Sequence, residues 1–252
     1  MAALYADPCA FDTLFETHVP HILEKIFLYL DYESFKTCFE VNRVWKRFLT
    51  SESCQKKAKS VFQEEILEKE KKLRSFSQMG NANEVRRIVS DGWLDINSSS
   101  AYGHVHITTP LCEAVSCGHK DVVEILLGAG ADPNNLARHN NLWPAHYGIA
   151  PLHIAALNGH PDMVQLLLHS GADPNIVTDR NPWTPLHYAA IIKRGAVIEG
   201  ERYREVIQLL LDYGGDPNIE DDNGETPLSF ALKNGDIFVI KMIEKATLGL
   251  DA

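Results

Sequence analysis

The clearest pattern in the chain is a repeated alternation of apolar and polar positions in its C-terminal two thirds. Apolar residues recur there at three- and four-residue spacing, which predicts helices that bury one face. The buried stripes are Val122, Val123, Leu126 and Leu127 in one unit, Met163, Val164, Leu167 and Leu168 in the next, and Val206, Ile207, Leu210 and Leu211 in a third. A shorter stretch with small residues precedes each stripe, so each unit is predicted to hold two helices.

A short string of residues marks the start of each unit. It reads TPLC at 109–112, APLH at 150–153, TPLH at 184–187 and TPLS at 226–229. Threonine at the N-cap accepts a hydrogen bond from the first turn of a helix, and proline at the next position loses only an N–H that has no helical partner. The first helix is expected to end at Gly118, Gly159 and Gly235, because glycine adopts the left-handed conformation easily.

A second string closes three of the units, reading GADPN at 130–134 and 171–175 and GGDPN at 214–218. Its aspartates are expected to form turns by accepting hydrogen bonds from nearby backbone N–H groups. With both strings, the units resemble the ankyrin repeat. This resemblance implies an all-α solenoid over residues 73–252, with four recognisable repeats and a degenerate one at 76–97.

The N-terminal part of the chain has a different helical pattern. Apolar positions between residues 19 and 48 suit three short amphipathic helices that break near Asp31 and Asn42. One interpretation is a helical cap on the repeat stack. The order of residues favours another, because Val19-Pro20, Leu30-Asp31 and Trp45 fall in step with the F-box pattern.

The resemblance to the F-box, a three-helix module within residues 1–55 with its core at 19–48, implies binding to a Skp-family adaptor. The adaptor-binding residues that it implies are Val19, Pro20, Ile22, Leu23, Ile26, Leu30, Phe35 and Trp45. A charged segment at 56–72, with Glu and Lys at helical spacing, is predicted to form a helical linker between the two modules.

Composition narrows the function further. The formal net charge is −10, and residues 100–252 carry 10 Lys and Arg against 19 Asp and Glu, so a nucleic-acid partner is not expected. The five cysteines include no Cys-x-x-Cys pair and follow no signal peptide, which indicates reduced thiols in the cytoplasm or nucleus. No apolar run is long enough to cross a membrane.

The sequence predicts neither catalysis nor a cofactor, since it has no nucleophile motif, phosphate-binding loop or paired catalytic carboxylates at recognisable spacing. His153 and His187 belong to the repeat motif and are expected to bond to neighbouring groups of the scaffold. Four other histidines, at 104, 106, 139 and 146, lie outside the repeat pattern and could converge on zinc. Because no cysteine stands at metal-ligand spacing, we expect no metal site.

The remaining candidate is a protein-binding surface. In ankyrin-like stacks the hairpin tips and the exposed ends of the first helices contact the partner. The substrate-binding residues expected on this basis are Trp143, Tyr147, Leu157, Asn158, Arg180, Trp183, Ile191, Ile192 and Lys233. Trp143 and Trp183 have an alternative role, in which they pack insertions onto the stack. Segments 135–149 and 191–205, where the chain exceeds the repeat length, are expected to flank the recognition surface.

An F-box joined to protein-binding repeats resembles the substrate receptor of an SCF-type cullin–RING ubiquitin ligase. The resemblance implies that the F-box binds the Skp-family adaptor and, through it, the cullin, while the repeats hold a protein substrate. The alternative is a ligase-independent ankyrin scaffold or inhibitor in which residues 19–48 only cap the stack.

Overall fold

The computed structural model describes residues 63–90, 94–102, 106–139, 146–179, 181–191 and 197–249. The predicted F-box core at 19–48 lies outside these residues. From residue 69 onward the described helices lie in one compact unit, Lys69–Ala252.

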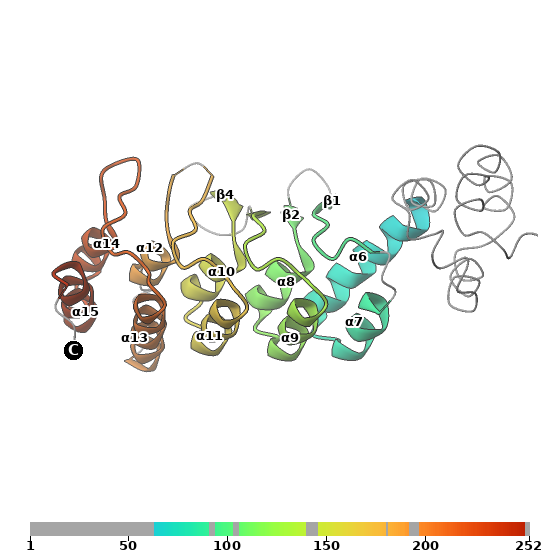
Figure 1. The fold of residues 1–252 in the computed structure, drawn as a ribbon, viewed down its shortest axis with the longest axis horizontal. Coiled ribbons are helices and arrows are strands. Elements are labelled where there is room, and N and C mark those ends of the chain that lie inside the picture. Colours follow the sequence, from blue (N-terminus) through green and yellow to red (C-terminus); the bar gives the residue numbers. More distant parts are fainter. Residues whose placement is uncertain are drawn as a thin grey trace, which may run out of the picture. The chain divides into compact units, whose positions relative to one another are not determined.

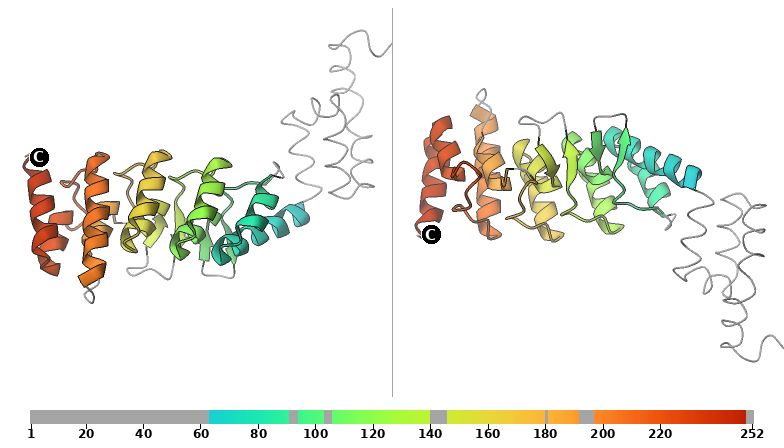
Figure 2. Two further views of the ribbon diagram at one scale, coloured as in Figure 1. Left: turned by 90° about the horizontal axis from the view of Figure 1, so that it is seen from below. Right: turned by 90° about the horizontal axis from the view of Figure 1, so that it is seen from above.

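The described chain is mainly helical, and its helices follow one another in pairs (Figure 1). The pairs are α6 (Gln63–Met79) with α7 (Ala82–Val89), α8 (Pro110–Cys117) with α9 (Lys120–Gly128), α10 (Pro151–Leu157) with α11 (Pro161–His169), α12 (Pro185–Ala190) with α13 (Val197–Asp212), and α14 (Pro227–Asn234) with α15 (Ile237–Thr247). Figure 2 shows the same pairs stacked side by side from two further directions. The predicted solenoid of helix pairs is therefore present.

The predicted helix boundaries have the expected local causes. The Thr109 side chain accepts a hydrogen bond from the backbone N–H of Cys112, and Pro110 takes the first helical position of α8. Gly118 and Gly235 end α8 and α14 with φ of 76° and 77°. Only glycine adopts this left-handed conformation without steric cost, so these two residues fix where the chain turns into the second helix.

The core lies between successive helix pairs. The predicted stripes supply it: Val123, Val164 and Ile207 have no exposed surface, and the same is true of Leu126, Leu167 and Leu210. Leu127 and Leu211 are half-buried at its edge. Helices α9, α11 and α13 pack against the first helix of their own pair and against the second helix of a neighbouring pair, so the apolar surface that each pair buries depends on its neighbours.

The all-α prediction needs a correction where the chain connects the helix pairs. Short strands β1 (Ser100–Tyr102) and β2 (His106–Thr108) form a hairpin before α8, and β3 (Ala137–His139) and β4 (His146–Ile149) form another before α10. The two hairpins join in a four-stranded antiparallel sheet in the order β1-β2-β3-β4. These connections are long enough for their backbone N–H and C=O groups to pair with one another.

The C-terminal part of the insertion predicted at 191–205 is helical and extends α13 at its N-terminal end. Helix α13 begins at Val197, so its first turns belong to this insertion. Tyr203 in the extension is only 6% exposed, and its hydroxyl donates a hydrogen bond of 2.8 Å to the carbonyl of Leu157 in α10. Its ring lies 3.1 Å from the position of a side-chain carbon added at Gly159, so a larger residue there would displace it.

Helix α6 includes the described part of the predicted charged linker. It runs through the boundary predicted at residue 72 and continues to Met79. Leu73 and Ser77, in the second half of this helix, are fully buried. Gly80, with φ of 73°, separates it from α7. No helix in the described part of the chain is long and apolar enough to cross a membrane.

Candidate protein-binding surface

Asparagine side chains hold the connections between helix pairs in register. The side-chain oxygens of Asn97, Asn134 and Asn175 accept hydrogen bonds of 2.7–2.8 Å from the backbone N–H groups of Asp132, Asp173 and Asp216, respectively. The amide nitrogens of Asn134 and Asn175 donate in turn to the carbonyls of Gly171 and Gly214. Each closing string is thereby bonded to the one in the next repeat, which fixes the spacing of the loops that present the surface.

The aspartates of the same strings form the predicted turns. Asp132 accepts a hydrogen bond of 2.8 Å from the backbone N–H of Asn134, and Asp173 does the same for Asn175 at 2.9 Å. This confirms the sequence-based prediction that these carboxylates are local turn formers.

The histidines of the repeat motif link successive repeats. His153 Nδ1 accepts from the backbone N–H of Ala150, so Nε2 carries the proton and donates to the carbonyl of Trp183 at 2.9 Å. His187 makes the corresponding bonds to Thr184 and to the carbonyl of Glu225. Burial lowers the pKa of His187, which keeps this imidazole in the neutral form that both bonds require. The predicted scaffold role of these histidines is confirmed.

Trp183 lies inside the stack and not at an exposed hairpin tip, so the structure favours the packing role that the sequence left open for it. It is 7% exposed, and its indole N–H donates to Asp221 Oδ2 at 2.9 Å. Its ring makes edge contacts with Tyr188 and Phe230 at centroid distances of 5.4 and 5.0 Å. A signal for this burial exists in the sequence, because Trp183 stands directly before the Thr-Pro start and the residue at the same place in the preceding unit, Ile149, is also apolar and fully buried.

Asp221 joins the connection before α12 to the connection before α14. Its burial opposes ionisation, but it accepts hydrogen bonds from the backbone of Glu225 and Asn223 and from the side chains of Trp183 and Asn181. These bonds outweigh the cost of burial and lower the pKa of Asp221 to about 2. The carboxylate is therefore charged at neutral pH and stabilises this part of the scaffold.

Among the expected substrate-binding residues, those at the ends of the first helices are described by the structure. Lys233 is exposed; it pairs with Glu225 and lies 5.3 Å from the centre of the Phe230 ring. Asn158 is half-buried and its amide reaches the carbonyl of Ser116 at 3.5 Å. Leu157 is only 5% exposed, and Ile191 is half-buried against the core, so both contribute more to packing than to the surface.

The side chains of the other residues expected to bind a partner lie outside the described part of the chain. Trp143, Arg180 and Ile192 lie outside the described residues. Tyr147 lies in β4, where the backbone alone is described. The adaptor-binding residues expected between Val19 and Trp45 also lie outside the described chain.

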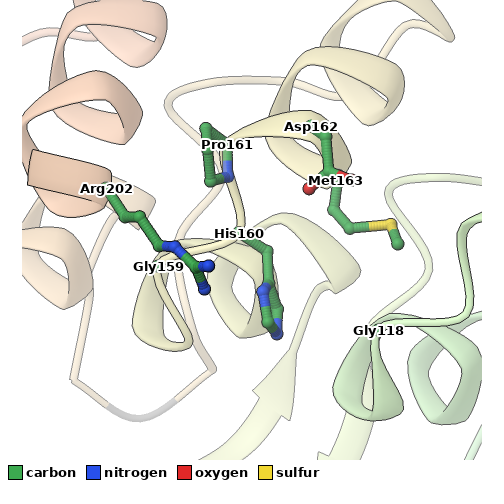
Figure 3. Close-up of a pocket in the computed structure, with 7 residues that line it drawn as sticks. All are labelled: Gly118, Gly159, His160, Pro161, Asp162, Met163 and Arg202. Atoms are coloured by element: carbon green, nitrogen blue, oxygen red, sulfur yellow. The ribbon is translucent and has the colours of Figure 1, made fainter. Parts of the chain in front are cut away.

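A pocket at the turns between first and second helices was not predicted from the sequence. It has a volume of about 330 Å³ and is lined by Gly118, Gly159, His160, Pro161, Asp162, Met163 and Arg202 (Figure 3). Burial lowers the pKa of His160, Asp162 opposes this shift and Arg202 adds to it. Arg202 comes from the extension of α13, so the pocket requires a residue that the repeat pattern alone does not place.

Comparison with known protein families agrees with this geometry. Residues 111–168 and 152–199 match a family model described as ankyrin repeats in many copies, and residues 183–222 match the ankyrin repeat model. These units are ankyrin repeats. Neither match reaches the N-terminal segment that resembles an F-box. No curated protein matches the chain. Because ankyrin repeats bind protein partners, the repeat array is a scaffold for protein–protein interaction.

Proposed function

We propose that this chain is the substrate-recognition subunit of an SCF-type cullin–RING ubiquitin ligase. The observation that carries the proposal is the combination of an F-box pattern, from Val19-Pro20 to Trp45, with an array of ankyrin repeats in the same chain. The N-terminal module binds a Skp-family adaptor, which connects it to the cullin. The repeats bind the protein substrate.

In this role the chain contributes proximity and no bond chemistry. It holds the substrate beside the ubiquitin-conjugating enzyme, which raises the effective concentration of the reacting groups. The asparagine, histidine and Trp183 contacts described above support this role. They keep successive repeats in fixed register, so the surface is ordered before the partner arrives and less conformational entropy is lost on binding.

The adaptor interaction gives the first test. The full chain is purified with a Skp-family adaptor, and the complex is compared with that of a Pro20→Ala/Leu23→Ala variant. We expect the double variant to lose at least tenfold in adaptor affinity, because it removes apolar contact area from a small interface. Lys233→Ala, in α14, is the matched control and is expected to bind the adaptor as the wild type does.

Two positions allow a test in which the usual F-box residue is restored. Val19 stands where leucine is usual in the F-box pattern, and Asn42 stands where cysteine is usual. Val19→Leu and Asn42→Cys are therefore expected to leave adaptor binding unchanged or to strengthen it. Wild-type binding no stronger than that of the Pro20→Ala/Leu23→Ala variant would favour the ligase-independent scaffold instead.

A further inference from the structure

The pocket at the turns between first and second helices is built by three successive helix pairs. Gly118 comes from the turn between α8 and α9, His160 from the turn between α10 and α11, and Arg202 from the N-terminal extension of α13 (Figure 3). Its volume of about 330 Å³ is at the lower end of the range for small-molecule sites. A group of the size of one side chain therefore fits inside it.

The residue next to Arg202 in the chain holds it at this pocket. Tyr203 is almost fully buried, and its hydroxyl donates a hydrogen bond of 2.8 Å to the carbonyl of Leu157 in α10. This bond fixes the α13 extension against the preceding repeat. The Arg202 side chain is exposed, and it forms no hydrogen bond or ion pair with the residues that the structure describes. In Figure 3 its guanidinium extends toward the imidazole of His160, so it is available to a ligand in the pocket.

His160 differs from the histidine at the same place in the preceding repeat. His119 also follows a turn glycine, and its Nε2 donates a hydrogen bond of 3.0 Å to the carbonyl of Gln78, at the end of the first helix before it. The corresponding carbonyl for His160 is that of Ser116, which accepts a hydrogen bond of 3.5 Å from the Asn158 amide instead. Within the described part of the chain the His160 imidazole has no hydrogen bond, and it lines the pocket (Figure 3).

The chemistry of these groups selects an oxyanion as the ligand. A guanidinium is always charged and has only hydrogen-bond donors, so Arg202 repels a cation and pairs well with a carboxylate or a phosphate. Burial lowers the pKa of His160, and although Asp162 opposes this shift, Arg202 adds to it. A neutral imidazole still offers one N–H donor. No side chain caps the start of α11 at Pro161, so the partial positive charge of this helix end also favours an anion.

We propose that this pocket binds an acidic side chain of the protein partner, a carboxylate or a phosphorylated serine or threonine. Arg202 pairs with the oxyanion, and His160 donates a second hydrogen bond to it. The exposed carboxylate of Asp162 in the same lining is the opposing charge, and it limits the affinity. The proposal rests on the role of the repeats in binding a protein and not on the F-box, so it is independent of the adaptor interaction.

The test uses the full chain and three capped peptides that differ only in their central residue, which is glutamate, phosphoserine or glutamine. Binding is followed by NMR at the ring signal of His160, which is assigned from its absence in His160→Gln. We expect at least one acidic peptide to shift this signal and the glutamine peptide to leave it unchanged; the tighter acidic peptide identifies the source of the oxyanion. Arg202→Gln is expected to weaken acidic-peptide binding by about tenfold, because the charged pair is lost. Asp162→Asn is expected to strengthen it by about threefold, because the opposing charge is removed.

Two controls separate this pocket from general attraction of acidic peptides. His119→Gln changes the equivalent histidine of the preceding repeat, and Lys241→Gln removes an exposed charge on α15; both are expected to bind the peptides as the wild type does. Circular dichroism checks the fold of each variant. Arg202→Gln is also expected to bind the adaptor normally, so this test and the adaptor test can fail separately. The proposal is overturned if neither acidic peptide shifts the His160 signal, if the glutamine peptide binds equally well, or if Arg202→Gln weakens binding no more than Lys241→Gln does.

Discussion

Helices α12 and α14 begin with the same Thr-Pro-Leu string but differ in what surrounds them. Leu186 and Ala190 in α12 have no exposed surface, whereas Leu228 at the first of these positions in α14 is half-buried. At the second position Leu232 is 57% exposed. Helix α12 packs between α10 and α14, while α14 packs against α12 on one side only in the described chain. Burial at a given motif position therefore depends on the neighbours of the repeat and not on the motif itself.

The largest loss of unfolding free energy is expected at Trp183, which contacts residues of two successive repeats. Trp183→Ala removes an indole that contacts Tyr188 and Phe230 and bonds to Asp221, so we expect a loss of about 3–5 kcal/mol in the free energy of unfolding. Urea unfolding followed by circular dichroism measures this loss. If partner binding weakens in this variant while its stability is unchanged, Trp183 acts at the surface and not in packing.

The same substitution in two equivalent helices tests the comparison directly. Leu186→Ala leaves a cavity in a position buried on both sides and is expected to cost about 2–5 kcal/mol. Leu228→Ala, in the half-buried equivalent, is expected to cost roughly 1 kcal/mol. Equal losses of unfolding free energy for the two variants would contradict the dependence on neighbouring repeats.

Acid should weaken the connection between the α12 and α14 repeats through Asp221. Its pKa is lowered in the folded state from 3.8 to about 2, so its contribution to stability is fully present above about pH 4 and is lost as the pH falls toward 2. Asp221→Asn should remove this part of the acid dependence and cost about 1.5 kcal/mol at neutral pH, because the charged hydrogen bonds are lost. Urea titrations of both proteins between pH 2 and pH 7 measure the difference, and parallel pH profiles would contradict it.

The smallest change in the free energy of unfolding is expected at Leu232, the exposed equivalent of Ala190. Leu232→Gln should change the unfolding free energy by no more than about 0.5 kcal/mol, since the side chain is mostly in solvent. Ala190→Gln, its matched partner, places a larger polar group in a fully buried position and is expected to cost about 1–3 kcal/mol. A larger loss at Leu232 than at Ala190 in thermal unfolding would show that the face of α14 is covered in solution.

Predictions from sequence succeeded where short-range chemistry decides the structure. Thr109, Pro110 and Gly118 begin and end α8 as expected, because capping depends on residues within one or two turns of a helix. The roles of His153 and His187 were also predicted, since each lies three residues after the N-cap residue whose backbone N–H it binds.

Predictions were incomplete where an insertion packs against a neighbouring repeat. The burial of Tyr203 against Leu157 depends on how far α13 extends, and the pocket at His160 depends on Arg202 from that extension. A repeat pattern contains no information on how an insertion in one unit packs against another.

The sequence by itself determined the repeat unit, the ends of its helices and the apolar stripes that form the core, because hydrophobic periodicity and capping are local properties. Only the tertiary structure decided which positions those stripes bury completely, since burial requires a neighbour on each side. It also decided the register in which Ile107 of β2 comes opposite Arg138 of β3. These residues belong to different repeats, and their separation is set by the stacking of the helices beneath them.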